Sequence, residues 1–109
     1  MHPARAQANQ SLYYSALHLR WLEQELEREQ IPASVVLEAA GRSVQWHVRE
    51  AYGWFLLELA GSSELPVTPP ESLERLLPLL DSSAAQRGEL IELINLERRP
   101  SWLLELLSD

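Results

Sequence analysis

Histidine and carboxylate side chains are the first candidates for a chemical function in this sequence, because together they bind metals in helical bundles. A di-iron or di-manganese bundle takes one Glu from each of two helices and a Glu-x-x-His pair from each of the others. Here His47 and Glu50 form the one neighbouring pair, in the reverse order. Other carboxylates occur at every second residue of an expected helix, so they alternate around it: Glu23, Glu25, Glu27 and Glu29. We therefore predict no metal site and no cofactor.

Arg42 and His47 form a second pattern, an Arg followed by four residues and a His. It resembles the motif of the HEPN ribonucleases, in which the Arg and the His act on a scissile RNA phosphate across a dimer. The resemblance implies a HEPN-like ribonuclease that uses Arg42 and His47. However, a step of five residues turns the two side chains about 140° apart on a helix, and so short a pattern also arises by chance. Arg42 and His47 are thus weak catalytic candidates, and this ribonuclease is the alternative to a binding function.

A structural role is the other interpretation of His47. The apolar residues on its own helical stripe would place the imidazole against the core as a neutral, hydrogen-bonded group: Ala40, Val44, Ala51 and Trp54. The serines occur in expected loops and caps, without a Gly-x-Ser-x-Gly elbow or a Gly-rich phosphate loop. The sequence therefore favours a protein that is not an enzyme.

Trp46 is the aromatic residue that suggests binding. Arg42, Arg49 and Glu50 share its helix surface and predict that its side chain faces solvent. An exposed Trp flanked by Arg is a common composition of protein interfaces. We therefore predict Trp46, with Arg42 and Arg49, as a contact surface for another protein chain.

Composition limits the class of protein. The chain has 109 residues, no Cys, and a formal charge of −7. It is large enough for one modest core, and its charge repels phosphate backbones, so we expect no general binding to nucleic acid. No stretch reaches the ~18 uninterrupted apolar residues of a membrane span, and the N-terminus lacks the apolar core of a signal peptide. We expect a cytoplasmic protein without membrane contact.

Apolar periodicity predicts two long helices in the first half of the chain. The first runs from about Asn9 to Gln30, and the second continues from Pro32, in its first turn, to Ala60. Gly61 suits the left-handed position that ends the second helix. The predicted buried stripe of the first helix is Leu12, Ala16, Leu19, Leu22 and Leu26, widened by Tyr13, Leu17 and Trp21.

The second half predicts shorter helices. Ser62–Pro70 reads as a connecting loop, and Thr68 with Glu71 forms a capping box for a third helix that Pro78 keeps short. A fourth helix begins at Ser82 or Ser83, and Pro100 kinks it or starts a short fifth helix. The apolar residues of these helices are Leu73, Leu76, Leu77 and Leu80, then Leu90, Ile91, Leu93, Ile94 and Leu96.

Together these elements predict an all-α fold, an antiparallel four-helix bundle with a short third helix and a Pro-kinked last helix. Residues 1–109 form one domain, with residues 1–8 as a disordered tail. Because the third helix is much shorter than the first two, one side of the long hairpin is left uncovered. We hypothesise that a second copy (a homodimer) or another protein covers it, since soluble monomers rarely expose such apolar strips.

Four segments resemble a small uncharacterised helical protein family, a domain of unknown function, of pseudomonads and related gammaproteobacteria. They are Asn9-Gln10 with Leu12-Tyr13-Tyr14 through Leu19 and Trp21; His47, Tyr52 and Glu58-Leu59-Ala60-Gly61; Glu89-Leu90 through Leu93; and Ser101-Trp102-Leu103. The resemblance implies a bacterial helical protein of unknown function and brings no catalytic residues. The family's last helix lacks a proline at the position of Pro100 and extends beyond the equivalent of Asp109. A kinked and shortened final helix is therefore expected here.

Overall fold

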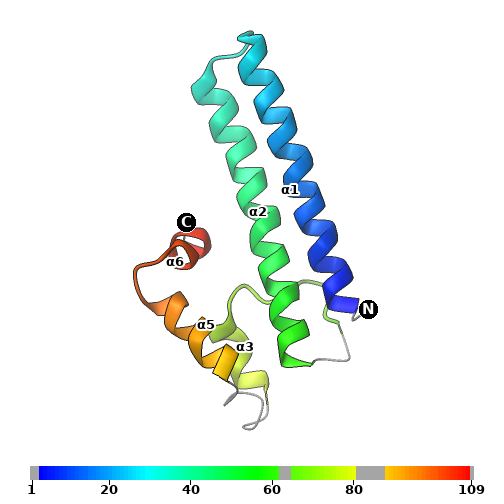
Figure 1. Cartoon of the computed structure of the whole chain (residues 1–109), viewed down its shortest axis with the longest axis vertical. Helices are drawn as coiled ribbons and strands as arrows, with labels where there is room; N and C mark the ends of the chain where they lie inside the picture. Colours follow the sequence, from blue (N-terminus) through cyan, green and yellow to red (C-terminus); the bar gives the residue numbers. More distant parts are fainter. Residues whose placement is uncertain (1–2, 62–64, 81–87, 109) are drawn as a thin grey trace.

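The computed structural model describes residues 3–61, 65–80 and 88–108, and within these ranges it contains helices and no strand (Figure 1). The elements are α1 (Pro3–Arg28), α2 (Ala33–Ala60), α3 (Leu73–Leu76), the 3-10 helix η1 (Leu77–Leu79), α5 (Gly88–Arg98) and α6 (Trp102–Leu107). The all-helical class is confirmed. One chain contains a long two-helix hairpin, with short helices beside the lower part of α2 (Figure 1).

The ends of α1 and α2 follow local rules. Glu29 adopts a left-handed conformation (φ 55°) where α1 ends. The carbonyl of Pro32 accepts hydrogen bonds from the amides of Val35 (3.0 Å) and Val36 (3.2 Å), which starts α2. At the other end Gly61 (φ 73°) donates its amide to the carbonyls of Leu57 and Glu58, so the predicted glycine stop is confirmed.

The contact between the two long helices is rich in small residues. We name as the contact seam the buried and half-buried residues Ala4, Ala8, Ser11, Ser15, His18, Leu22 and Glu25 on α1, and Val36, Ala40, Ser43, His47, Ala51 and Trp54 on α2. Steps of three and four residues along α1 keep these positions on one stripe. The hydroxyl of Ser15 donates to the carbonyl of Ser11 at 3.1 Å, so this polar group is satisfied inside the seam.

The predicted buried stripe of the first helix is therefore wrong in part. Leu12 is 50% exposed and Leu19 is 44% exposed, whereas Ser11 and Ser15 are buried. The leucine stripe lies one residue, or about 100°, further around α1 than the contact seam. The apolar stripe of α1 exists as predicted, but α2 packs against the contact seam next to it.

The predicted disordered tail is also wrong where the structure describes it. Residues 3–8 are the first turns of α1, Ala4 and Ala8 are buried against the core that includes Trp54, and Arg5 forms an ion pair with Glu58. Residues 1 and 2 lie outside the described residues. Burial of small apolar side chains explains why the helix continues through a segment without strong hydrophobic residues.

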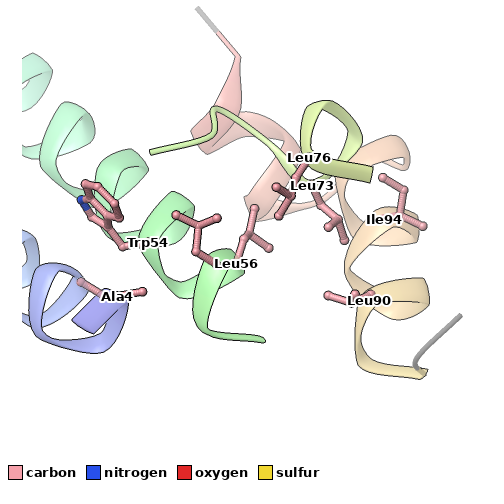
Figure 2. Packing of buried hydrophobic residues seen from close by; sticks show 9 residues of the cluster. Ala4, Trp54, Leu56, Leu73, Leu76, Leu90 and Ile94 are labelled. Carbon is pink, nitrogen blue, oxygen red and sulfur yellow. The ribbon is translucent and has the colours of Figure 1, made fainter. Parts of the chain in front are cut away.

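The main core lies at the open end of the hairpin. Figure 2 shows side chains from α2, α3 and α5 converging there, with Leu56 of α2 facing Leu73 of α3. The buried residues of this core are Ala4, Ala8, Trp54, Leu56, Leu57, Leu73, Leu76, Leu90 and Ile94. Its packing attaches the short helices to one side of the hairpin.

The third helix starts later than predicted. Thr68 does not cap it; the hydroxyl of Ser72 accepts the amide of Arg75 at 3.3 Å, and α3 begins at Leu73. Pro69 and Pro70 instead pack onto Gly53 of α2, where an added Cβ would lie 2.8 Å from the Cβ of Pro69. The segment before α3 thus crosses one face of the hairpin before the chain turns into the short helix (Figure 1).

Pro100 separates two helices and does not kink one. α5 ends at Arg98, and α6 starts after Ser101, whose hydroxyl accepts the amide of Leu104 at 3.2 Å. The predicted start of the preceding helix at Ser82 or Ser83 lies outside the described residues. The molecule is elongated, with extents of 54 × 32 × 19 Å, and its radius of gyration of 16.1 Å exceeds the ~13 Å of a compact domain of this length.

Candidate functional site

Arg42 and His47 lie on different sides of α2. The guanidinium of Arg42 forms an exposed ion pair with Glu38 at 3.2 Å. The ring of His47 lies in the contact seam, 5.5 Å from the ring of Tyr14 and 5.0 Å from the ring of His18, measured between centroids. One copy of the chain therefore does not bring the two catalytic candidates into a shared cleft.

The two histidines of the seam contact each other and their neighbours in the hairpin. The hydroxyl of Ser43 and Nδ1 of His18 are joined by a hydrogen bond of 2.8 Å. Nδ1 of His47 is buried, and no protein atom pairs with it. The sequence predicted the packing of His47 against its neighbours, but its expected hydrogen bond is not present at Nδ1. Among the described residues, no group of three or more His, Cys, Asp or Glu could hold a metal ion.

The buried carboxylate of Glu97 connects three helices. It accepts the phenol of Tyr52 at 2.5 Å and the amides of Leu73 (2.7 Å) and Glu74 (3.2 Å), so it caps α3 from α5. Burial, followed by the hydrogen bond to Glu97 and its charge, raises the pKa of Tyr52 above its usual value of 10.0. Sequence reasoning missed this glutamate because it occurs in a helix with several other acidic residues. Its role is structural.

Trp46, the predicted contact residue, is 59% exposed. It lines a hollow of about 480 Å³ together with Arg49, Glu50, Leu107 and the segment from Thr68 to Glu71. Arg49 is already used within the chain: its Nε donates to the carbonyl of Leu106 at 2.5 Å, and a second nitrogen donates to the carbonyl of Ser108. Arg49 therefore anchors the end of α6 beside Trp46.

Two faces of the hairpin flank the contact seam. Both helices are right-handed and antiparallel, so the residue that follows each seam position lies on the same face in both helices. We name this the leucine face: Leu12, Ala16, Leu19 and Leu26 of α1 with Leu37, Val44, Val48 and Phe55 of α2. The residues that precede the seam positions form the tryptophan face: Tyr14, Leu17 and Trp21 of α1 with Val35, Ala39 and Trp46 of α2.

Both faces expose apolar side chains: on the tryptophan face Tyr14, Leu17, Trp21, Val35 and Trp46 are between 39% and 59% exposed. The tryptophan face carries a shallow hollow of about 430 Å³ beside Leu17, Trp21 and Ala39, and Pro69 and Pro70 cover Gly53 on the same side. On the leucine face Leu12, Leu19, Leu37 and Phe55 are between 41% and 52% exposed, whereas Tyr52, which follows Ala51, is half-buried and bonded to Glu97 of α5. Side chains of this kind at these spacings pack into a neighbouring helix when one is present.

Within the described ranges, no helix has the length and apolar character that a membrane crossing requires. Comparison with protein-family models, with curated proteins and with solved structures finds no match. The resemblance to the gammaproteobacterial family therefore stays a prediction, and the surfaces of the molecule carry the functional argument.

Proposed function

We propose that this chain is a small acidic, non-catalytic interaction protein that binds protein along the leucine face of its hairpin. The observation that carries this function is a second apolar stripe with helix-packing spacing on each long helix, next to the stripe that already forms the contact seam. Leu12, Leu19 and Leu26 recur every seven residues on α1, and Leu37 and Val44 do so on α2.

Exposure supports this proposal. Leu12, Leu19, Leu37 and Phe55 are between 41% and 52% exposed, and the other leucine-face residues between them are partly exposed, so apolar positions recur along both helices rather than singly. The charged residues at leucine-face positions are Arg5 and Glu23, toward opposite ends of α1. A strip with an apolar centre and polar ends has the composition of a protein interface.

A second proposed contact surface lies on the side of the hairpin opposite the leucine face and consists of Trp46, Arg42 and Arg49. The exposed indole beside the hollow at Pro69 and Pro70 supports contact with protein there. The ribonuclease alternative has no comparable support, because Arg42 and His47 lie on different sides of α2. An RNA-cleavage assay of the purified protein and of His47→Ala tests that alternative.

Binding of an apolar fluorescent dye tests the leucine face. At concentrations where the protein is monomeric by mass, we expect the dye to bind and Leu12→Asn/Leu19→Asn to remove most of the signal. The matched control is Leu17→Asn/Trp21→Asn, which makes two residues of the tryptophan face polar; the leucine-face signal should remain. A monomer that binds no dye, or whose dye binding does not depend on Leu12 and Leu19, would contradict the proposal.

A further inference from the structure

We infer that the occupant of the leucine face is a second copy of this chain, packed antiparallel, so that two hairpins make one four-helix bundle with a two-fold axis near Ala16 and Val48. This inference rests on the proposed function, because it names the partner of the same face. The helices α1 and α2 would each pack against their own equivalents in the other copy.

The registry of the hairpin follows from its contacts. Arg5 of α1 is level with Glu58 of α2, and His18 is level with Ser43 and His47. Steps of seven residues from these pairs place Leu12 level with Ala51, Leu19 with Val44 and Leu26 with Leu37. The middle of the leucine face therefore lies at the level of Ala16 and Val48.

Shape along α2 is self-complementary about this middle. Phe55 is seven residues after Val48 and is 41% exposed, whereas Gly41 is seven residues before Val48 and has no side chain. A Cβ built on Gly41 would meet nothing within 4 Å, so the position is an open notch in the face. A two-fold axis at Val48 places Phe55 of each copy at the notch of the other copy.

Polarity along α1 favours the same arrangement. Asn9 and Glu23 lie seven residues on either side of Ala16, so antiparallel packing brings the amide of Asn9 to the level of the other copy's Glu23 carboxylate. In the same arrangement Leu12 of one copy lies close to the level of Leu19 of the other copy. If the two hairpins instead ran parallel, Asn9 would lie at the level of Phe55 and Glu23 at that of Gly41, which pairs a polar group with an aromatic ring.

The chain exposes more surface than a compact monomer of its mass. A compact folded monomer of 12.5 kDa exposes ~6,200 Å², whereas this chain exposes 7396 Å². The difference of about 1,200 Å² is comparable with the ~800 Å² that each partner buries in a standard protein interface. A second copy on the leucine face would bury part of this excess surface.

Sedimentation equilibrium of the untagged protein over a wide concentration range tests the inference. We expect wild type to reach twice the chain mass of 12.5 kDa. Leu19→Asn and Gly41→Leu should each raise the dissociation constant at least about tenfold. The matched control is Leu17→Asn, which changes the same residue type at similar exposure on the tryptophan face and should leave the dissociation constant within about threefold.

Gly41→Leu separates the interface from the fold. Leucine is a better helix former than glycine and meets no atom within 4 Å at its Cβ, so circular dichroism should show an equally stable helix while the dimer weakens. A monomer at all concentrations would overturn the inference, and so would a dimer that Leu19→Asn and Gly41→Leu leave unchanged. A monomer whose leucine face still binds the dye would contradict only the inference that the partner is a second copy. A monomer that binds no dye would also contradict the proposed function.

Discussion

The phenol of Tyr52 donates a hydrogen bond of 2.5 Å to the carboxylate of Glu97, and this contact joins the hairpin to the short helices. The two residues are 45 positions apart in the sequence. The same carboxylate accepts the amides of Leu73 and Glu74, which are the free donors at the start of α3. A single buried acidic group therefore links α2, α3 and α5 by hydrogen bonds, beside the apolar core that packs the same helices together.

Removal of the Glu97 carboxylate should destabilise the fold strongly. In Glu97→Ala the buried amide of Leu73 and the phenol of Tyr52 lose their acceptor, so we expect the free energy of unfolding to fall by ~3 kcal/mol. Urea unfolding followed by circular dichroism measures this change. Glu92→Ala, an exposed position on the same helix, is the control and should change stability by less than ~0.5 kcal/mol. Equal effects of the two variants would contradict the role of Glu97.

Stability should fall in alkaline solution because of Tyr52. Its pKa is raised in the folded state by burial and by Glu97, so the unfolded chain loses the phenol proton first as the pH rises above 10.0. The contribution of Tyr52 is fully present below that pH and is lost progressively above it. Urea unfolding between pH 9 and 11 should show a steeper decrease for wild type than for Tyr52→Phe. If the free energy of unfolding falls equally with pH in both proteins, Tyr52 does not cause the decrease.

Two glycines of α2 should respond in opposite directions to the same substitution. Gly53→Ala places a Cβ 2.8 Å from the Cβ of Pro69, so we expect a loss of ~1–3 kcal/mol in unfolding free energy. Gly41→Ala meets no neighbour within 4 Å and should stabilise the helix by ~0.5–1 kcal/mol. Thermal unfolding of both variants, each at a concentration where it is monomeric, checks the pair. A stable Gly53→Ala protein would mean that Pro69 and Pro70 do not pack tightly there.

Trp46 should not contribute to the proposed antiparallel dimer, because its side chain lies on the tryptophan face. We expect Trp46→Ala to leave the dissociation constant unchanged within about threefold, and Phe55→Ala to raise it about tenfold or more. Sedimentation equilibrium of both variants compares them directly. Dimer loss in Trp46→Ala alone would instead place the second copy against the surface that the sequence predicted, around Trp46, Arg42 and Arg49.

The helices themselves could be predicted because their signals are local. Pro32 and Gly61 mark the two ends of α2 through their own backbone geometry, and no distant residue is needed to interpret them. The cap of the third helix cannot be located from local signals alone, because Thr68 and Ser72 are both suitable N-cap residues and Thr68 also has Glu71 three positions later. Packing of Pro69 and Pro70 on Gly53 decides between them, and that contact is not visible in the sequence.

Local residue patterns are enough to predict that the chain is helical, where its long hairpin turns, and that α1 has a stripe of leucines. That Ser11 and Ser15 are buried while Leu12 and Leu19 are exposed follows only from how α1 packs on α2. Only the tertiary structure, likewise, makes Glu97 a buried cap. Apolar periodicity along a helix shows which of its faces favours burial. Which element packs on that face depends on residues far along the chain or in another molecule.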